Sequence, residues 1–330
     1  MDSITHIPGI LAAHATNAEA GTGCTVILCP DGGTGGVDVR GGAPATRETD
    51  LLRPEETVDV LHAVVLSGGS AYGLAASCGV AEELEQAGVG IDVLVGRVPI
   101  VSGACLFDLF VGDPHVRPTA ADGARATRAA LAERDVAPDA RTPLPRGNVG
   151  AGTGCTVGKL TGPERAMKAG LGEAVEQLGE LVCGAVAAVN ACGDVVNPAT
   201  GQYVAGTLAA DGSHIEGALH VALGEQASEF EALVPQRTNT TISCVVTNAK
   251  LTKAQATKVA QMAADAYAHA ISPTHTTSDG DTVFVLATGA VQTNVDVVGM
   301  LATRALERAI VDGAMNATSA YGLTAACDLQ

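Results

Sequence analysis

Residues 237–250, RTNTTISCVVTNAK, join a short polar cluster directly to an apolar, β-branched run that is typical of a buried strand. Thr240 and Thr241 lie at the head of that run. If the chain is cut between Asn239 and Thr240, Thr240 carries an α-amino group beside its own hydroxyl. A free α-amine titrates near pH ~8, so this one residue then supplies both a nucleophile and a base. The segment is a candidate for N-terminal nucleophile chemistry, although threonines are also common where a strand begins.

Other motifs fit their consensus patterns less well. GTGCTVGK (152–159) fails as a phosphate loop, because Thr153 and Leu160 occupy positions where that loop needs glycine and Ser/Thr. SGGSAYG (67–73) follows an apolar run and can either bind an anion through backbone amides or simply allow close packing. The eight histidines form no H-E-x-x-H pattern, and no two cysteines form C-x-x-C. We therefore expect no metal and no organic cofactor.

Composition and charge limit the partners of the chain. The 36 acidic and 19 basic residues give a net charge of −17, which repels nucleic acids and anionic membranes. No apolar run reaches the ~20 residues that span a bilayer, and the N-terminus lacks the features of a secretory signal. The nine cysteines lie mostly in apolar runs, as expected of buried thiols in a reducing compartment. We predict a cytoplasmic protein that binds neither nucleic acid nor membrane.

The elements that must position Thr240 are typical of a layered α/β protein. Hydrophobic residues make up 47% of the chain but aromatic residues only 2%, so small aliphatic side chains must fill the core. Strands are predicted at 23–29, 152–160, 181–191, 242–247 and 282–287, a strand, glycine turn and helix at 60–88, a helix within 116–148, and an exposed linker at 223–239. The best-defined helix begins at Thr252, which forms a capping box with Gln255, and ends before Ser272-Pro273.

Over nearly its whole length the sequence resembles the P1 family (peptidase family S58) of N-terminal nucleophile hydrolases. This family includes L-aminopeptidase/D-esterase, β-peptidyl aminopeptidases and the 6-aminohexanoate (nylon) oligomer hydrolase. The matching segments are RGGAPATRETDLL (40–52), LSGGSAYGLAAS (66–77), GRVPIVSGACLFDL (96–109), GAGTGCTVGK (150–159), NTTISCVVTNAKLT (239–252) and PTHTTSDGDTVF (273–284). The resemblance implies a single domain, residues 1–330, folded as a four-layer αββα sandwich. It also implies a precursor that cuts itself between Asn239 and Thr240 into chains 1–239 and 240–330.

The resemblance further implies roles for individual residues. Thr240 matches the nucleophile, and Lys159 matches a lysine that favours the ionised hydroxyl or the neutral amine. Asn190 matches the asparagine whose amide serves the oxyanion hole. Asp279 and Asp281 match an acidic pair that holds the α-ammonium of Thr240 and pairs with Lys159. Each of these residues, taken singly, also fits an ordinary role as a surface lysine or as turn-forming Asn and Asp.

Two residues depart from the family pattern. Phe107 lies where relatives can carry a tyrosine whose hydroxyl is near the oxyanion, so the oxyanion hole must rely on Asn190 and backbone amides. Thr238 replaces the glycine that often precedes the Asn-Thr pair, and this less flexible residue is expected to slow self-cleavage. We expect Phe107 and Tyr72 to line the substrate pocket.

Together these residues indicate an N-terminal-threonine amidohydrolase or aminopeptidase that cleaves peptide or amide bonds through an acyl-enzyme on Thr240. Small peptides or amides with a free amino group are the expected substrates, because carboxylates accept charge-assisted hydrogen bonds from ammonium. The resemblance also implies a homo-oligomer of αβ units. Two alternatives remain: an acyltransferase that uses the same acyl-enzyme, and an uncut, silent homologue that binds a ligand or acts as a scaffold.

Overall fold

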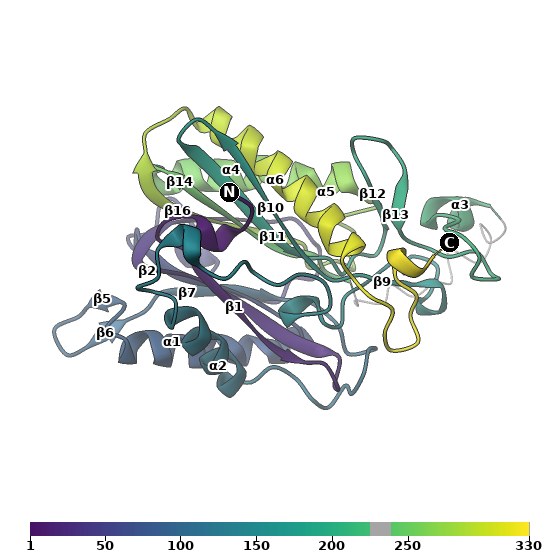
Figure 1. Cartoon of the computed structure of the whole chain (residues 1–330), viewed down its shortest axis with the longest axis horizontal. Helices are drawn as coiled ribbons and strands as arrows, with labels where there is room; N and C mark the ends of the chain where they lie inside the picture. Colours follow the sequence, from purple (N-terminus) through teal and green to yellow (C-terminus); the bar gives the residue numbers. More distant parts are fainter. Residues whose placement is uncertain (225–238, 330) are drawn as a thin grey trace.

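Nine strands form one continuous sheet that bends into two facing layers (Figure 1). The computed structural model describes residues 1–224 and 239–329. Along the sheet the strands follow the order β10 (Leu171–Leu178), β11 (Leu181–Ala188), β14 (Ile242–Ala249), β16 (Thr282–Val291), β2 (Thr22–Val39), β4 (Leu61–Ser67), β7 (Val101–Cys105) and β3 (Thr46–Arg47), and β1 (Leu11–Asn17) pairs with β2. The pairs β14–β16 and β4–β7 are parallel, and the other pairs are antiparallel.

Strand β2 links the two layers because its two halves pair with different strands. Residues 22–28 pair with β1 and, over most of that length, with β4. Residues 34–39 pair instead with β16. Between the two halves the register with β4 shifts, and Gly32 adopts a φ of +81°, which glycine tolerates at no steric cost. The strand therefore turns from one layer into the other.

Helices cover the outer face of each layer. On one side lie α4 (Lys253–Ala263) and α6 (Val295–Met315), which pack against β10, β11, β16 and the second half of β2, with α5 (Asp265–Ala270) beside α6. On the other side lie α1 (Ala76–Gln86) and α2 (Ala120–Leu131), which pack against β1, β2, β4 and β7. The order helix, sheet, sheet, helix is visible in Figure 1 and confirms the expected αββα sandwich.

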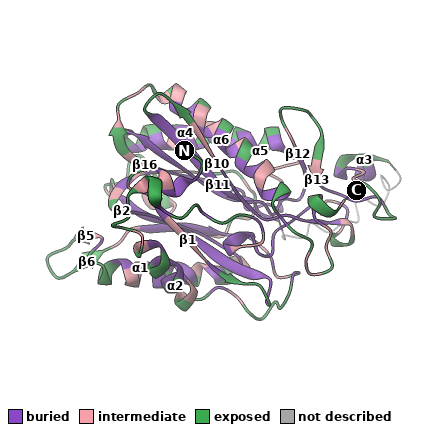
Figure 2. Ribbon diagram, viewed as in Figure 1, coloured by how far each residue is buried: buried purple, intermediate pink, exposed green. Residues whose placement is uncertain are grey.

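The side chains of β4 show why this layering forms. Ala63 and Val65 belong to an apolar cluster with α1 and α2, whereas Val64 and Leu66 belong to the larger cluster that contains β14 and β16. Successive side chains of a strand point to opposite faces, so a strand that is apolar at every position is stable only when both faces are covered. Figure 2 shows the resulting buried strands at the centre of the molecule.

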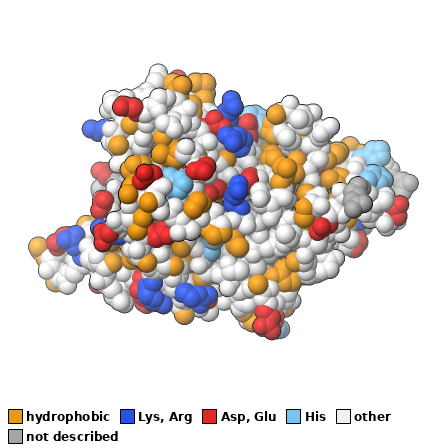
Figure 3. Space-filling model, in the orientation of Figure 1, with side chains coloured by type: hydrophobic (Ala, Val, Ile, Leu, Met, Phe, Trp, Pro, Cys, Tyr) orange, Lys and Arg blue, Asp and Glu red, His pale blue; other side chains and the backbone are white. Residues whose placement is uncertain are grey.

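Several shorter strands and one short helix lie outside the nine-stranded sheet and its covering helices. Pairs form between β5 (Ile91–Asp92) and β6 (Arg97–Val98), between β8 (Thr156–Val157) and β9 (Met167–Lys168), and between β12 (Asp194–Val196) and both β13 (Tyr203–Ala205) and β15 (Ile271–Ser272). The short helix α3 (Ala218–Leu223) precedes the residues that are not described. Within the described residues no helix is both long and apolar enough to cross a membrane. On the face in Figure 3, acidic side chains are distributed widely, with basic side chains between them.

Most of the predicted elements are confirmed, as β2, β4, β11, β14, β16, α1 and α2. The capping box of Thr252 and Gln255 is present, but the helix it starts ends at Ala263, and α5 is a separate helix. The strand predicted at 152–160 is wrong except at Thr156–Val157, because its glycines form turns instead. The predicted linker lies almost wholly outside the described residues.

Candidate active site

Strand pairing explains why residues far apart in the sequence meet at Thr240. Near the start of β14, Ile242 pairs with Ala188 at the end of β11 and with Thr282 at the start of β16. The segment that follows β11 and the segment that precedes β16 therefore converge just ahead of β14. Thr240 is buried at this point, and its backbone N–H donates a hydrogen bond to the carbonyl of Asn190 at 2.9 Å. The sheet itself thus assembles the site.

The peptide bond between Asn239 and Thr240 is enclosed by hydrogen bonds. Asn239 forms an isolated parallel bridge with Asp279. Within this bridge the Gly280 N–H donates to the Asn239 carbonyl oxygen at 3.2 Å and to Thr240 Oγ1 at 3.1 Å. The Thr240 hydroxyl in turn donates to the Asn239 carbonyl oxygen. The hydroxyl of Thr240 therefore lies against the carbonyl of the bond whose cleavage is predicted.

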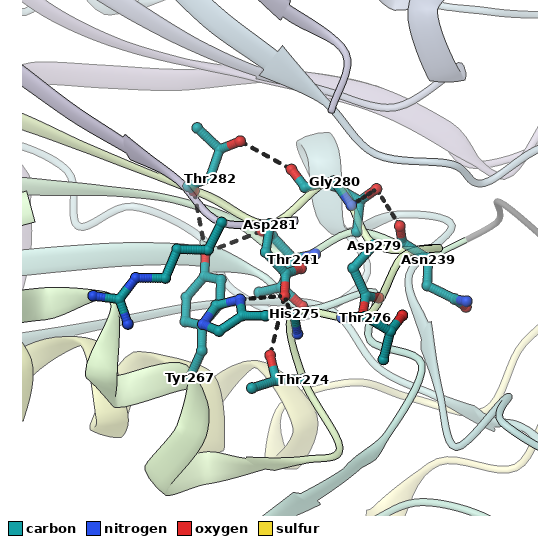
Figure 4. A network of polar contacts seen from close by, with 12 residues as sticks. Asn239, Thr241, Tyr267, Thr274, His275, Thr276, Asp279, Gly280, Asp281 and Thr282 are labelled. Atoms are coloured by element: carbon teal, nitrogen blue, oxygen red, sulfur yellow. Dashed lines mark hydrogen bonds and ion pairs between the residues drawn. The ribbon is translucent and has the colours of Figure 1, made fainter. Parts of the chain in front are cut away.

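Asp281 anchors the next peptide unit (Figure 4). Its Oδ1 accepts a hydrogen bond from the Thr241 N–H at 2.8 Å. Its Oδ2 accepts three more, from Thr274 Oγ1 at 3.0 Å and from the backbone N–H and Nδ1 of His275 at 3.1 and 2.9 Å. The carboxylate is thus used to join the head of β14 to the 274–276 loop. A role in holding the α-ammonium of Thr240 stays a prediction.

Tyr267 and His275 are parts of this site that the sequence patterns did not reveal. Tyr267 is fully buried on α5, and its hydroxyl contacts the carbonyls of Thr241 and Thr282 at 3.1 and 3.2 Å and Ser243 Oγ at 2.9 Å. Burial raises the pKa of Tyr267 well above its usual range, so the hydroxyl stays neutral. The imidazole of His275 stacks on this ring at 5.5 Å between centroids. Helical spacing predicted Tyr267 as a core residue, which is correct for its ring but misses its hydroxyl.

Lys159 reaches the same backbone carbonyl as the candidate nucleophile. Its Nζ donates to Asn190 Oδ1 at 2.8 Å and to the Asn190 backbone oxygen at 3.3 Å, which also accepts the Thr240 N–H. The residue is partly exposed, but its ammonium faces this buried asparagine, and burial lowers the pKa of Lys159 to about 8. The ammonium of Lys159 and the nitrogen of Thr240 therefore both donate to the backbone oxygen of Asn190 and lie close together.

The Asn190 side chain is fully buried in a network of its own. Its Oδ1 accepts hydrogen bonds from Lys159 and from the Thr156 N–H at 3.1 Å. Its Nδ2 donates to the Phe107 carbonyl at 2.8 Å. One N–H of the amide is thus committed to the protein backbone. The proposed contribution of Asn190 to the oxyanion hole stays a prediction.

Asp279 lies beside these groups with an unusual protonation equilibrium. Burial, together with the nearby charge of Asp281, raises the pKa of Asp279 to about 6, although its Oδ2 accepts the Thr276 N–H at 2.7 Å. A carboxylate with this pKa changes charge just below neutral pH. The site therefore contains one group that titrates near 6 and one, Lys159, that titrates near 8.

We expect Asp279→Asn to raise the free energy of unfolding at neutral pH, because the buried carboxylate destabilises the folded chain there. The pKa of Asp279 is about 6 in the folded chain and ~3.9 in an unfolded chain. The contribution of its protonated carboxyl to stability is therefore fully present below pH ~4 and is lost as pH rises through about 6. We therefore expect the variant to be more stable than its parent near pH ~7.5 and equally stable near pH ~4, measured by urea unfolding with both proteins kept as single chains by Thr240→Ala. The exposed Asp139→Asn controls for the loss of one negative charge. Equal destabilisation of Asp279→Asn at both pH values would contradict the prediction.

A small cavity of about 110 Å³ opens beside Lys159 and Phe107. It is lined by Phe107, Asp108, Phe110, Val111, Thr156, Lys159, Pro163, Ala166, Tyr321 and Leu323. Phe107 and Phe110 meet edge to face at 5.2 Å, which forms a stable aromatic wall. The second predicted pocket residue, Tyr72, is not among the lining residues. It is 62% exposed, and the guanidinium of Arg117 lies 3.9 Å from the centre of its ring.

Sequence comparisons relate this chain to a family of peptidases. The pattern of the family described as Peptidase family S58 matches residues 2–326. An uncharacterized aminopeptidase of Mycobacterium leprae is 42% identical over an alignment 356 positions long, which covers 100% of this chain and 94% of the relative. The 6-aminohexanoate-oligomer endohydrolase of Kocuria sp. is 29% identical over 324 residues, which cover 93% of this chain and 84% of the relative.

Solved structures confirm the fold. The L-aminopeptidase D-Ala-esterase/amidase from Ochrobactrum anthropi, described as a variant of the Ntn hydrolase fold, aligns with a TM-score of 0.66 at 19% identity, over 96% of this chain and 86% of that one. A β-aminopeptidase from Burkholderia sp. aligns with a TM-score of 0.63 at 22% identity over the same shares of the two chains. The chain belongs to peptidase family S58 and is a hydrolase that acts on peptide or amide bonds.

Proposed function

We propose that this protein is an aminopeptidase or oligoamide hydrolase that cuts its own Asn239–Thr240 bond and then uses Thr240 as an N-terminal nucleophile. The observation that carries the proposal is the contact of the Thr240 hydroxyl with the Asn239 carbonyl, in a buried bridge ahead of β14. Two other groups support it. Lys159 and the Thr240 nitrogen share the Asn190 carbonyl, and Asp281 holds the following peptide unit.

In the self-cleavage step, Thr240 Oγ adds to the carbonyl carbon of Asn239. The hydroxyl proton ends on the Thr240 nitrogen as the C–N bond breaks, which leaves an ester between Asn239 and the threonine oxygen. Water then hydrolyses that ester, giving a carboxylate on Asn239 and restoring the Thr240 hydroxyl. The new α-amine remains next to the Asn190 carbonyl, where the N–H already lies.

In the hydrolysis of substrate, the free α-amine of Thr240 accepts the hydroxyl proton as Oγ attacks the substrate carbonyl. The leaving amine takes that proton, and water then releases the acyl group from Thr240. The positive charge of Lys159 disfavours protonation of the neighbouring α-amine, because like charges repel. Lys159 therefore helps to keep the base neutral at physiological pH.

We propose the cavity beside Lys159 as the site for the acyl part of the substrate, with Phe107 as one of its walls. Its small volume and mainly apolar lining fit a short aliphatic residue. The names of the relatives point to two substrate groups, peptides with a free N-terminus and 6-aminohexanoate oligomers. Assembly of several αβ units, a cytoplasmic location and the slowing effect of Thr238, which lies outside the described residues, stay predictions.

The test is intact-mass measurement of the purified protein with N-terminal sequencing of any fragments. We expect two chains in place of the 32.9 kDa precursor, with the smaller one beginning TTISCVV. The cut protein should hydrolyse at least one member of a panel of amino-acid 4-nitroanilides and 6-aminohexanoate oligomers. A stable single chain without amidase activity would contradict the proposal and favour a silent homologue. Transfer of the acyl group to an added amine in preference to water would indicate an acyltransferase.

A further inference from the structure

We propose that the main-chain N–H of Gly280 stabilises the negative charge that develops on the Asn239 carbonyl oxygen during self-cleavage. This inference rests on the self-cleavage proposed above. The N–H lies 3.2 Å from that carbonyl oxygen and 3.1 Å from Thr240 Oγ1, measured from nitrogen to oxygen. A single donor therefore faces both oxygen atoms that take part in the reaction.

The reaction strengthens one of these two hydrogen bonds. When Thr240 Oγ adds to the carbonyl carbon, the Asn239 oxygen changes from a neutral carbonyl to an oxyanion. Hydrogen bonds to a charged acceptor are shorter and roughly twice as strong as neutral ones. Asn239 and Thr240 are 4% and 5% exposed, so water screens this interaction little. The gain appears only in the transition state, which is the condition for acceleration.

The donor is held in place before the reaction begins. The carbonyl of the same peptide unit, at Asp279, accepts a hydrogen bond from the Ala43 N–H at 2.8 Å. On the other side of the residue, Thr282 Oγ1 donates to the Gly280 carbonyl at 2.9 Å. Both flanking aspartates are themselves anchored, Asp279 by Thr276 and Asp281 by the His275 loop. No reorganisation of the donor is therefore needed when the oxyanion forms.

The closeness of the nucleophile favours glycine at this position. A Cβ at residue 280 would lie 2.8 Å from Thr240 Oγ1 and 3.0 Å from the Ala43 carbonyl oxygen. Either contact would displace the hydroxyl or the backbone. The glycine of the DGD motif thus allows the backbone amide to reach the reacting atoms, in addition to forming a turn.

The Gly280 amide and the Asn190 side chain are different donors. Asn190 Nδ2 is bonded to the Phe107 carbonyl in the uncut chain, whereas the Gly280 N–H is directed at the bond to be cut. We therefore assign Gly280 to the self-cleavage step in particular. The predicted role of Asn190 concerns the later hydrolysis of substrate.

The test replaces the amide at residue 280 with an ester, by incorporating glycolic acid through nonsense suppression in cell-free translation. This exchange removes the N–H and adds no atom. We expect the precursor to be cut ~10²–10³-fold more slowly than wild type, the loss typical of one oxyanion donor, as followed by intact mass over time. The matched control is glycolic acid at Gly42, whose N–H donates to the Thr276 carbonyl at 3.2 Å in the same region.

Three outcomes distinguish an error in the role of Gly280 from an error in the proposed self-cleavage. Rapid cutting of the residue-280 ester would overturn the role of Gly280 while leaving self-cleavage intact. Equal slowing of both esters, with equal loss of thermal stability, would also overturn it, because the effect would then be structural. A wild-type chain that stays uncut under the same conditions would overturn self-cleavage itself.

Discussion

Thr240→Ala should remain a single chain of about 33 kDa and lose all measurable amide hydrolysis. The substitution removes the only hydroxyl that contacts the Asn239 carbonyl among the described residues, so neither the ester intermediate nor the acyl-enzyme can form. The expected loss is the whole nucleophilic contribution, several orders of magnitude in rate. Intact-mass measurement reports the first effect, and a 4-nitroanilide assay reports the second.

The neighbouring threonine provides a matched control for this variant. Thr241 Oγ1 is buried without a hydrogen-bond partner among the described residues, so Thr241→Val should leave cutting and hydrolysis close to wild type. Thr240→Ser keeps a hydroxyl and should still be cut. A Thr240→Ala protein that yields two chains, or a Thr241→Val protein that yields one, would place the nucleophile elsewhere.

Lys159→Met should reduce kcat/KM by ~10²-fold or more and move the acid limb of the pH–rate profile upward by roughly one pH unit. Removing the positive charge beside Asn190 makes protonation of the Thr240 α-amine easier, so a higher pH is needed to free the base. Because burial lowers the pKa of Lys159 to about 8, the two amines titrate as a coupled pair in wild type. The measurement is kcat/KM from pH ~6 to pH ~9, normalised to the amount of cut chain.

Lys159→Arg separates charge from proton transfer. Arginine stays charged throughout this pH range, so it should keep the limb near its wild-type position and retain more activity than methionine. If the arginine variant is as inactive as the methionine variant, Lys159 acts through proton transfer and not through its charge. A limb that stays unmoved in Lys159→Met would remove Lys159 from any influence on the α-amine.

The layered fold and the residues at Thr240 were within reach of the sequence because they lie in continuous, recognisable segments. The runs at 23–29, 181–188, 242–247 and 282–287 are largely apolar, which predicts strands buried on both faces, and every residue of these runs is buried. The DGD segment and Lys159 matched family motifs. What the sequence could not supply was the register that brings them together, since Ile242 meets Ala188 and Thr282 through pairings far apart along the chain.

Other features could not be predicted from the sequence because a residue type has a role in this fold that is unusual for it. Lys168 is fully buried, and its ammonium donates to the carbonyls of Gly152, Cys155 and Ala169, although lysine is ordinarily a surface residue. Burial lowers the pKa of Lys168 to about 8. Likewise, the apolar face of a helix predicts that Tyr267 is buried but not that its hydroxyl contacts the head of β14. Hydrogen-bond partners of this kind depend on tertiary packing and leave no periodic signal.

The order of strands in the sheet gives the proposed cut a lasting kinetic consequence. After a cut at Asn239–Thr240, β14 and β16 would belong to the second chain, yet they lie between β11 and β2, which would belong to the first. The two products would therefore stay interleaved in one sheet, and we expect the cut protein to unfold as one cooperative unit. Unfolding, however, would release two separate molecules, and their return would depend on concentration because they must first meet. Maturation would thus turn a chain that can refold alone into one whose folded state persists mainly because it opens slowly.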